Sequence, residues 1–176
     1  MKKIIGFITI VAILATLGYF SHRIYTKMQA KQEAISRMEN LPSFILQKTD
    51  STSYSHTNLL LNKFTIFIFF NSECDFCKHE AQSIYDELDL FTNVQFLFIS
   101  SEPIEAISKF ASEYQLINQP NITFLYDRNS LFSSELDIQS IPTVLIYNEH
   151  QKLLKKHKGQ LNPNGILKII NKHERS

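Results

Sequence analysis

The residues with the clearest capacity for chemistry are Cys74 and Cys77, the only two cysteines in the chain. They are separated by two residues and lie between an apolar, strand-like run at 64–70 and a segment with helical spacing that starts directly after them. The first sulfur therefore falls at the start of a helix, where unpaired backbone N–H groups and the helix dipole favour a thiolate. The second sulfur lies one turn further on. This arrangement predicts a pair of thiols that can form and break a disulfide.

Other uses of a Cys-x-x-Cys pair fit this chain less well. Covalent haem attachment requires histidine directly after the second cysteine, but Lys78 occupies that position and His79 follows it. A structural zinc site needs four ligands, and no second Cys/His pair accompanies His79. We therefore expect no metal at this site and favour redox chemistry.

Strand-like and helix-like segments alternate from residue 42 onward. Runs rich in apolar and β-favouring residues predict strands that are buried on both faces, and helical spacing of apolar residues predicts helices between them. Such alternation predicts one α/β domain, with helices on both faces of a central sheet. The expected strands are 64–70, 94–99, 122–126, 143–147 and 152–158, and the expected helices start after Cys77, at Pro103, near Leu131 and at Asn162–Pro163.

The amino-terminal segment carries a different signal. Residues Ile4–Phe20 form an uncharged run of 17 residues, the short end of what can span a bilayer as a helix. Aromatic residues follow where a signal peptidase would need small ones, so an uncleaved anchor is favoured over a cleaved signal peptide. We expect a transmembrane signal anchor at residues 1–21, a helical stalk at 22–41 and the α/β domain at 42–176.

The overall composition excludes several classes of function. Hydrophobic residues make up 44% of the chain and the net charge is +1, so neither disorder nor a nucleic-acid partner is indicated. The sequence contains no glycine-rich phosphate loop and no Ser-His-Asp arrangement.

Four motifs give the domain a family resemblance. They are Pro-Ser-Phe-Ile-Leu at 42–46, the Cys74–Cys77 motif after its apolar strand, Ser-Ile-Pro-Thr at 140–143 and Gly-Gln-Leu at 159–161. With these motifs, the chain from Pro42 onward resembles the thioredoxin superfamily, in particular its membrane-anchored TlpA/ResA-like thiol-disulfide oxidoreductases. The resemblance implies a thioredoxin-like fold with a mixed central sheet and no cofactor.

The resemblance also implies roles for individual residues. Cys74 would be the exposed, attacking thiol, and Cys77 the more buried thiol that resolves the mixed disulfide. Pro142 would be cis and lie against the cysteines, and the backbone of Ile141 would pair with an extended substrate segment. Glu80 stands where ResA-like members carry an active-site glutamate, and would accept the proton of Cys77; an exposed surface charge is the alternative for this residue.

These features together predict a protein-disulfide oxidoreductase at a membrane, with its domain facing the periplasm or another extracytoplasmic space. Its partners would be protein thiols and disulfides, and a thiol carrier in the membrane would supply electrons. Glu73, Asp75 and Glu80 oppose a thiolate at Cys74, while Lys78 and His79 favour it, and no basic residue lies between the cysteines. We therefore expect a stable disulfide and hence a reductase. An oxidase or isomerase on the same fold, and a non-enzymatic binding module, are the alternatives. A copper-handling relative fits less well, because such proteins usually space their cysteines by three.

Overall fold

The computed structural model describes residues 2–175, and the side chains of 14–29, 36 and 38–175. The chain divides into two compact units, Met1–Arg37 and Met38–Ser176. Helix α1 (Lys2–Glu39) is continuous, without a break at the expected boundary between residues 21 and 22. Met38 belongs to the second unit, and its side chain is buried.

The expected membrane anchor lies largely outside the residues whose side chains the structure describes. Most of the predicted span, Ile4–Ile13, has its side chains outside the described residues. Within the part that is described, no helix combines the length and the mean hydropathy of a membrane-crossing segment.

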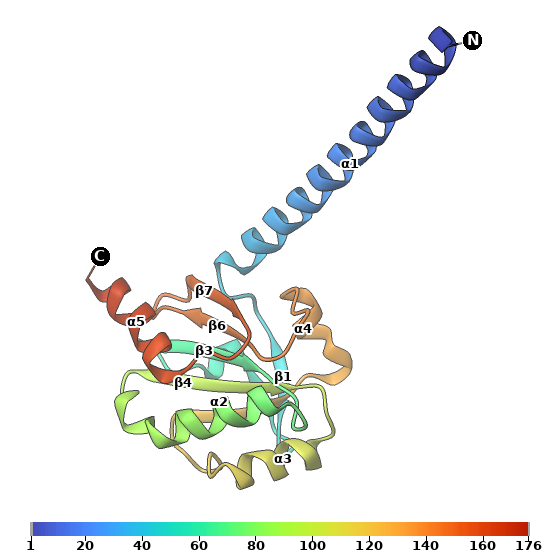
Figure 1. The fold of residues 1–176 in the computed structure, drawn as a ribbon. Helices are drawn as coiled ribbons and strands as arrows, with labels where there is room; N and C mark the ends of the chain where they lie inside the picture. Colours follow the sequence, from blue (N-terminus) through green and yellow to red (C-terminus); the bar gives the residue numbers. More distant parts are fainter. Residues whose placement is uncertain (1, 176) are drawn as a thin grey trace. The chain divides into compact units, whose positions relative to one another are not determined.

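A seven-stranded mixed sheet forms the centre of the second unit (Figure 1). Its spatial order is β2-β1-β5-β4-β3-β6-β7. The three strands β3, β4 and β5 are parallel, whereas β1, β6 and β7 each run antiparallel to their neighbours. The strands are β1 (Ile45–Lys48), β2 (Ser53–Ser55), β3 (Phe64–Phe69), β4 (Val94–Ser100), β5 (Ile122–Tyr126), β6 (Thr143–Tyr147) and β7 (Leu153–Lys158).

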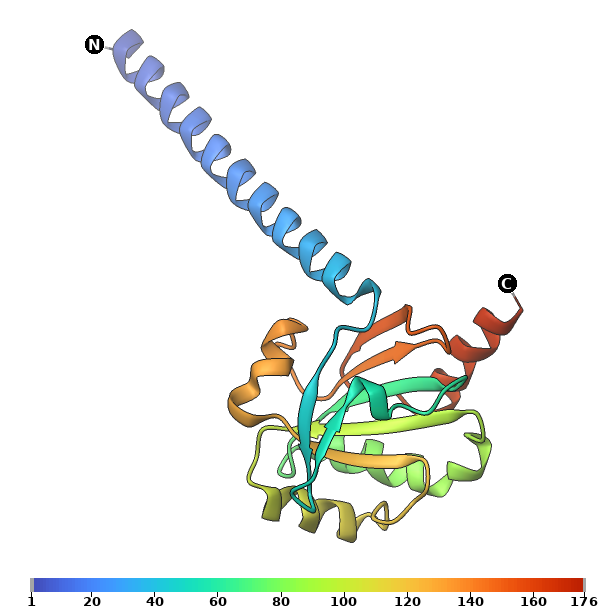
Figure 2. The ribbon, with the colours of Figure 1, turned by 180° about the vertical axis from the view of Figure 1, so that it is seen from behind.

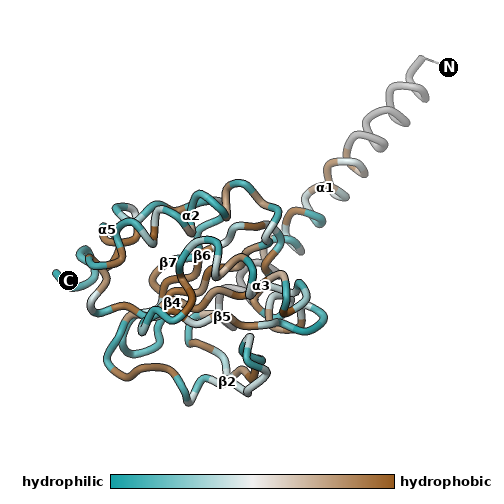
Figure 3. Tube along the Cα trace, turned by 90° about the horizontal axis from the view of Figure 1, so that it is seen from below, coloured by the Kyte–Doolittle hydropathy of each residue, from teal (hydrophilic) through white to brown (hydrophobic). Residues whose placement is uncertain are grey.

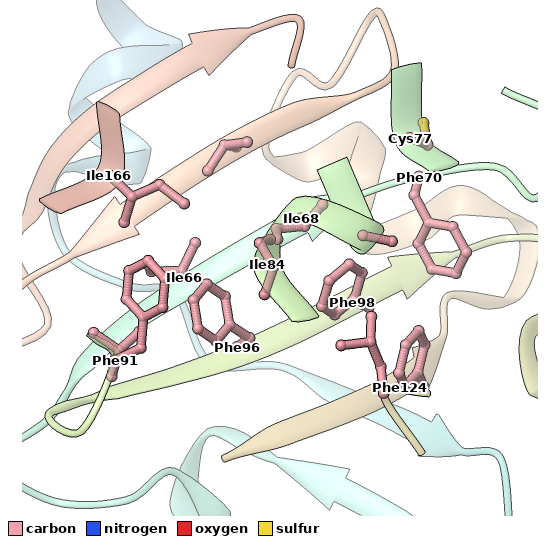
Figure 4. Packing of buried hydrophobic residues seen from close by; sticks show 14 of the residues in the cluster. Ile66, Ile68, Phe70, Cys77, Ile84, Phe91, Phe96, Phe98, Phe124 and Ile166 are labelled. Carbon is pink, nitrogen blue, oxygen red and sulfur yellow. The ribbon is translucent and has the colours of Figure 1, made fainter. Parts of the chain in front are cut away.

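Three helices cover one face of the sheet, and Figure 4 shows the side chains that meet there. These helices are α2 (Asp75–Asp86), α3 (Ile104–Glu113) and α5 (Pro163–Glu174). Alternate residues of the central strands point toward them, as the period of two in a strand requires. Ile66 and Ile68 of β3, for example, lie with Ile84 of α2 and Ile166 of α5 in one apolar cluster. Full burial of each such side chain contributes about 1.5–3 kcal/mol to folding.

The opposite face is covered more thinly, by the short helix α4 (Leu131–Glu135) and by Phe44 from the segment before β1 (Figure 2). Aromatic rings fill the space there. The ring of Phe67 lies 5.8 Å from Phe44, 5.9 Å from Phe132 and 5.7 Å from Tyr147, in edge-on arrangements. Helices therefore lie on both faces, as predicted, but three of the four helices of this unit share one face.

Local signals explain where the helices begin. Asn162 caps α5 by accepting a hydrogen bond from Gly165 N, and Pro163 takes the first helical position, as predicted. Pro103 is the cap residue of α3, one position before the first turn where the sequence placed it.

Figure 3 shows hydrophobic residues concentrated along the strands, with hydrophilic residues on the loops and along α2.

Candidate active site

The two cysteines lie where β3 gives way to α2. Cys74 is the cap residue of α2, and its carbonyl oxygen accepts the N–H groups of Cys77 and Lys78 at 3.0 Å each. Asn71 shapes the preceding loop: its carbonyl accepts Cys74 N, and its side chain accepts Glu73 N at 2.9 Å. Both cysteines are free thiols here, with Cys74 half-buried and Cys77 fully buried. This is the exposure pattern expected of an attacking and a resolving thiol.

The buried thiol has a strongly altered acidity. Burial is the main reason why the pKa of Cys77 lies far above its ordinary value. Its thiol also donates to the sulfur of Cys74, and the negative charges of Cys74 and Glu80 raise the pKa further. The backbone N–H of Asn71 acts in the opposite direction by donating to the Cys77 sulfur. Cys77 therefore needs a proton acceptor before it can act as a nucleophile.

Glu80 is fully buried, with no exposed surface. It lies one helical turn beyond Cys77, and its Oε1 accepts the backbone N–H of Leu161 at 2.8 Å. Its Oε2 has no hydrogen-bond partner among the described residues. Burial raises the pKa of Glu80 to about 8, although the Leu161 N–H lowers it. The surface-charge alternative for Glu80 is therefore wrong, because the carboxyl group is buried.

The segment before β6 lies beside the end of β3, where the thiol loop begins. The Ile141–Pro142 peptide bond is cis, and Thr143 Oγ1 donates to Ser140 O at 2.6 Å within this loop. Because Phe69 pairs with Thr143 across β3 and β6, Pro142 stands beside the start of the thiol loop. Pro142 is buried, whereas Ile141 remains 45% exposed. The cis bond is the one that the resemblance implied for Pro142.

The turn after β7 completes the site. Gly159 adopts a φ of +94°, a conformation that favours glycine, and its N–H donates to Pro142 O at 2.8 Å. Two residues later, Leu161 N donates to Glu80. The Gly159–Leu161 turn therefore joins the cis-proline loop to the buried carboxylate.

Glu102 is a site residue that the sequence did not reveal. Its carboxylate accepts Ser72 N at 2.6 Å and Ser72 Oγ at 2.7 Å, and it also accepts Ser100 Oγ at 3.1 Å. It thus ties the thiol loop to the end of the neighbouring strand β4. The sequence did hold a signal for it. Glu102 follows the predicted strand 94–99, and the thiol loop follows its parallel neighbour 64–70, so both lie at the same end of the sheet.

We expect Glu102→Gln to lower the free energy of unfolding by about 1–3 kcal/mol, because glutamine offers the two donors of Ser72 a single, uncharged acceptor oxygen. Urea unfolding measures this change. The rate of Cys74 alkylation, measured alongside it, is expected to change as the loop loosens. The exposed Glu105→Gln in α3 is the matched control. Wild-type stability and alkylation in Glu102→Gln would contradict the tether.

The surface near the thiols mixes apolar and charged groups. Phe76 in the first turn of α2 is 65% exposed, and Asp75 forms an exposed ion pair with Lys78 at 3.5 Å. Within the described residues, no three His, Cys, Asp or Glu side chains gather as a metal site would require.

A thioredoxin-like fold with a dithiol at the start of its first sheet-covering helix defines the class of this protein. The AhpC/TSA family model matches residues 38–156, and the chain belongs to this family. Among curated proteins, nothing matches the sequence.

Solved structures show the same fold at low sequence identity. A secreted disulfide oxidoreductase of Mycobacterium tuberculosis, homologous to E. coli DsbE, has a TM-score of 0.63 and 18% identity, covering 78% of this chain and 98% of that one. StoA from Bacillus subtilis has a TM-score of 0.59 and 18% identity, covering 73% and 96%. Arabidopsis thaliana ScoI with copper bound has a TM-score of 0.58 and 16% identity, covering 74% and 98%.

Proposed function

We propose that this protein reduces disulfides in other proteins through Cys74 and Cys77. The observation that carries the proposal is the pairing of an accessible thiol at a helix start with a buried thiol next to a buried carboxylate. The structural similarity to disulfide oxidoreductases supports it.

The reaction proceeds in two exchanges. The Cys74 thiolate attacks one sulfur of the substrate disulfide, a mixed disulfide forms, and the other substrate sulfur leaves as a thiolate. Cys77 then loses its proton to ionised Glu80 and attacks the Cys74 sulfur. This step releases the second substrate thiolate and leaves a Cys74–Cys77 disulfide. Two electrons have passed from the dithiol to the substrate.

Glu80 suits the role of proton acceptor because its pKa is raised. A general base works best when its pKa lies near the working pH, and burial raises the pKa of Glu80 to about 8. The backbone of Ile141, exposed beside the thiol loop, is proposed to pair with an extended segment of the substrate.

We infer the reducing direction from the local charges. Glu73 and Asp75 oppose a thiolate at Cys74, and the positive charge of Lys78 is shared with Asp75 through their ion pair. When the thiolate of the reduced form is weakly stabilised, the disulfide form is the more stable one. A pair with a stable disulfide acts as a reductant. A reduction potential near −120 mV, as in DsbA, would contradict this direction and favour an oxidase.

The Cys77→Ser variant tests the proposal. Expressed in its own cell, it is expected to hold substrate proteins as mixed disulfides on Cys74, because the second exchange cannot occur. The Cys74→Ser variant, which keeps only the buried thiol, is the matched control and is expected to trap none. If Cys77→Ser traps no protein either, the pair has a structural role only.

The proposal includes a location outside the cytoplasm, with the Ile4–Phe20 segment as a membrane anchor and a membrane thiol carrier as electron donor. The uncharged run in the sequence supports the anchor. A membrane-impermeant maleimide added to intact cells is expected to label Cys74 in the full chain. Labelling only after lysis would contradict this location.

A further inference from the structure

A half-buried histidine on β7 is connected to Glu80 through a single peptide group. His157 Nε2 lies 3.2 Å from the carbonyl oxygen of Gln160. That carbonyl belongs to the same peptide unit as the N–H of Leu161, which donates to Glu80 Oε1 at 2.8 Å. His157 binds the carbonyl oxygen of this peptide unit, and Glu80 binds its N–H. Because a peptide unit is planar and rigid, the two hydrogen bonds together fix its orientation.

The direction of these hydrogen bonds is fixed by chemistry. A carbonyl oxygen only accepts, so His157 Nε2 carries a hydrogen and donates to Gln160. A hydrogen bond to the carbonyl polarises the peptide group and strengthens its N–H as a donor. The stronger donor in turn stabilises the ionised form of Glu80, the form that accepts a proton.

The surroundings of Glu80 leave few other groups that could act in this way. From α2, the titratable group that interacts with Glu80 is Cys77. The buried residues of β3, β6 and α5 in the same cluster are apolar. On β7, His157 pairs with Val144, whose side chain belongs to that cluster, so His157 faces the same side of the sheet. Lys155, which pairs with Ile146 of the same cluster, also faces this side but is exposed, as is Lys158.

We propose that His157 is a positioning residue, which orients and polarises the Gln160–Leu161 peptide so that its N–H supports ionised Glu80. This proposal rests on the proposed role of Glu80 as the acceptor of the Cys77 proton. His157 does not touch the reacting sulfurs and acts only through the peptide group.

The test is a titration of the Glu80 carboxyl carbon by NMR, with the full chain held in reductant. His157→Phe removes the donor, and the midpoint of Glu80 is expected to rise by roughly 0.1–0.7 pH unit, because one polarising hydrogen bond strengthens the next by about 10–30%. His157→Gln places an amide nitrogen where Nε2 lies and is expected to restore the wild-type midpoint. His157→Thr serves as a second variant if His157→Phe folds poorly. Threonine favours strands but is too short to donate to Gln160, so the Glu80 midpoint is expected to shift as in His157→Phe.

Two results would overturn the proposal. One is an unchanged Glu80 midpoint in His157→Phe or His157→Thr. The other is an equal shift in His157→Phe and His157→Gln, because restoring the donor would then have no effect. The titration needs no substrate, so it separates this proposal from the proposed function, which fails instead if Cys77→Ser traps no partner.

Discussion

Replacing Glu80 with glutamine is expected to slow resolution of the mixed disulfide by about 10²-fold or more, the usual contribution of a positioned general base. The raised pKa of Cys77 means that its thiol rarely ionises unaided. Glutamine keeps the size of the side chain and an oxygen for the Leu161 N–H, but it cannot accept a proton. The first exchange, in which Cys74 attacks, is expected to be nearly unaffected.

A symmetrical aromatic disulfide such as dithiobis(nitrobenzoate) separates the two steps. Attack by Cys74 releases the first coloured thiolate, and attack by Cys77 releases the second. In the wild type, the second phase is expected to accelerate as pH rises through about 8, where Glu80 ionises. Glu80→Gln is expected to lose this inflection. Asp86→Asn, an exposed change in the same helix, is the control, and an unchanged second phase in Glu80→Gln would remove Glu80 from the mechanism.

Glu80 is also expected to make the free energy of unfolding depend strongly on pH. Its pKa is about 8 in the folded chain, against an ordinary value of 4.5 for glutamate. Between these two values the folded state holds the proton more tightly, so unfolding releases it and stability falls as pH rises. The contribution is complete below pH 4.5 and lost above pH 8. It amounts to about 5 kcal/mol, since one pKa unit corresponds to about 1.4 kcal/mol.

Urea unfolding in reductant at several pH values between 4.5 and 8.5 measures this slope. Working below pH 9 keeps the titration of Cys77 out of the comparison. Glu80→Gln is expected to flatten the curve, because glutamine does not titrate; its unpaired amide lowers stability by an amount that does not depend on pH. Parallel curves for the wild type and Glu80→Gln would show that Glu80 does not titrate as the buried group described here.

Most of the fold follows from local patterns in the sequence. The apolar runs at 64–70 and 94–99 correspond to β3 and β4, and the Asn162–Pro163 signal marks the start of α5. The uneven distribution of helices did not follow, because a helix's apolar stripe indicates that one face is buried but not which face of the sheet it covers.

The site was only partly predictable. The burial of Glu80 has a sequence signal, because positions 77, 80, 81 and 84 share one helical face and the other three are apolar. Glu102 and His157 act through contacts between residues far apart in the chain or across a turn. The sequence predicts a strand at 152–158, but both faces of this strand carry polar side chains, so the period of two does not indicate that His157 is half-buried.

The edges of the sheet have a consequence for how molecules of this protein meet one another. β2 is only three residues long, and β7 carries exposed lysines at 155 and 158. The start of β7 is further shielded by Asn40, which pairs with Lys152. Short or positively charged edge strands disfavour pairing with a strand from another molecule. Concentrated solutions of the protein are therefore expected to resist aggregation by sheet extension.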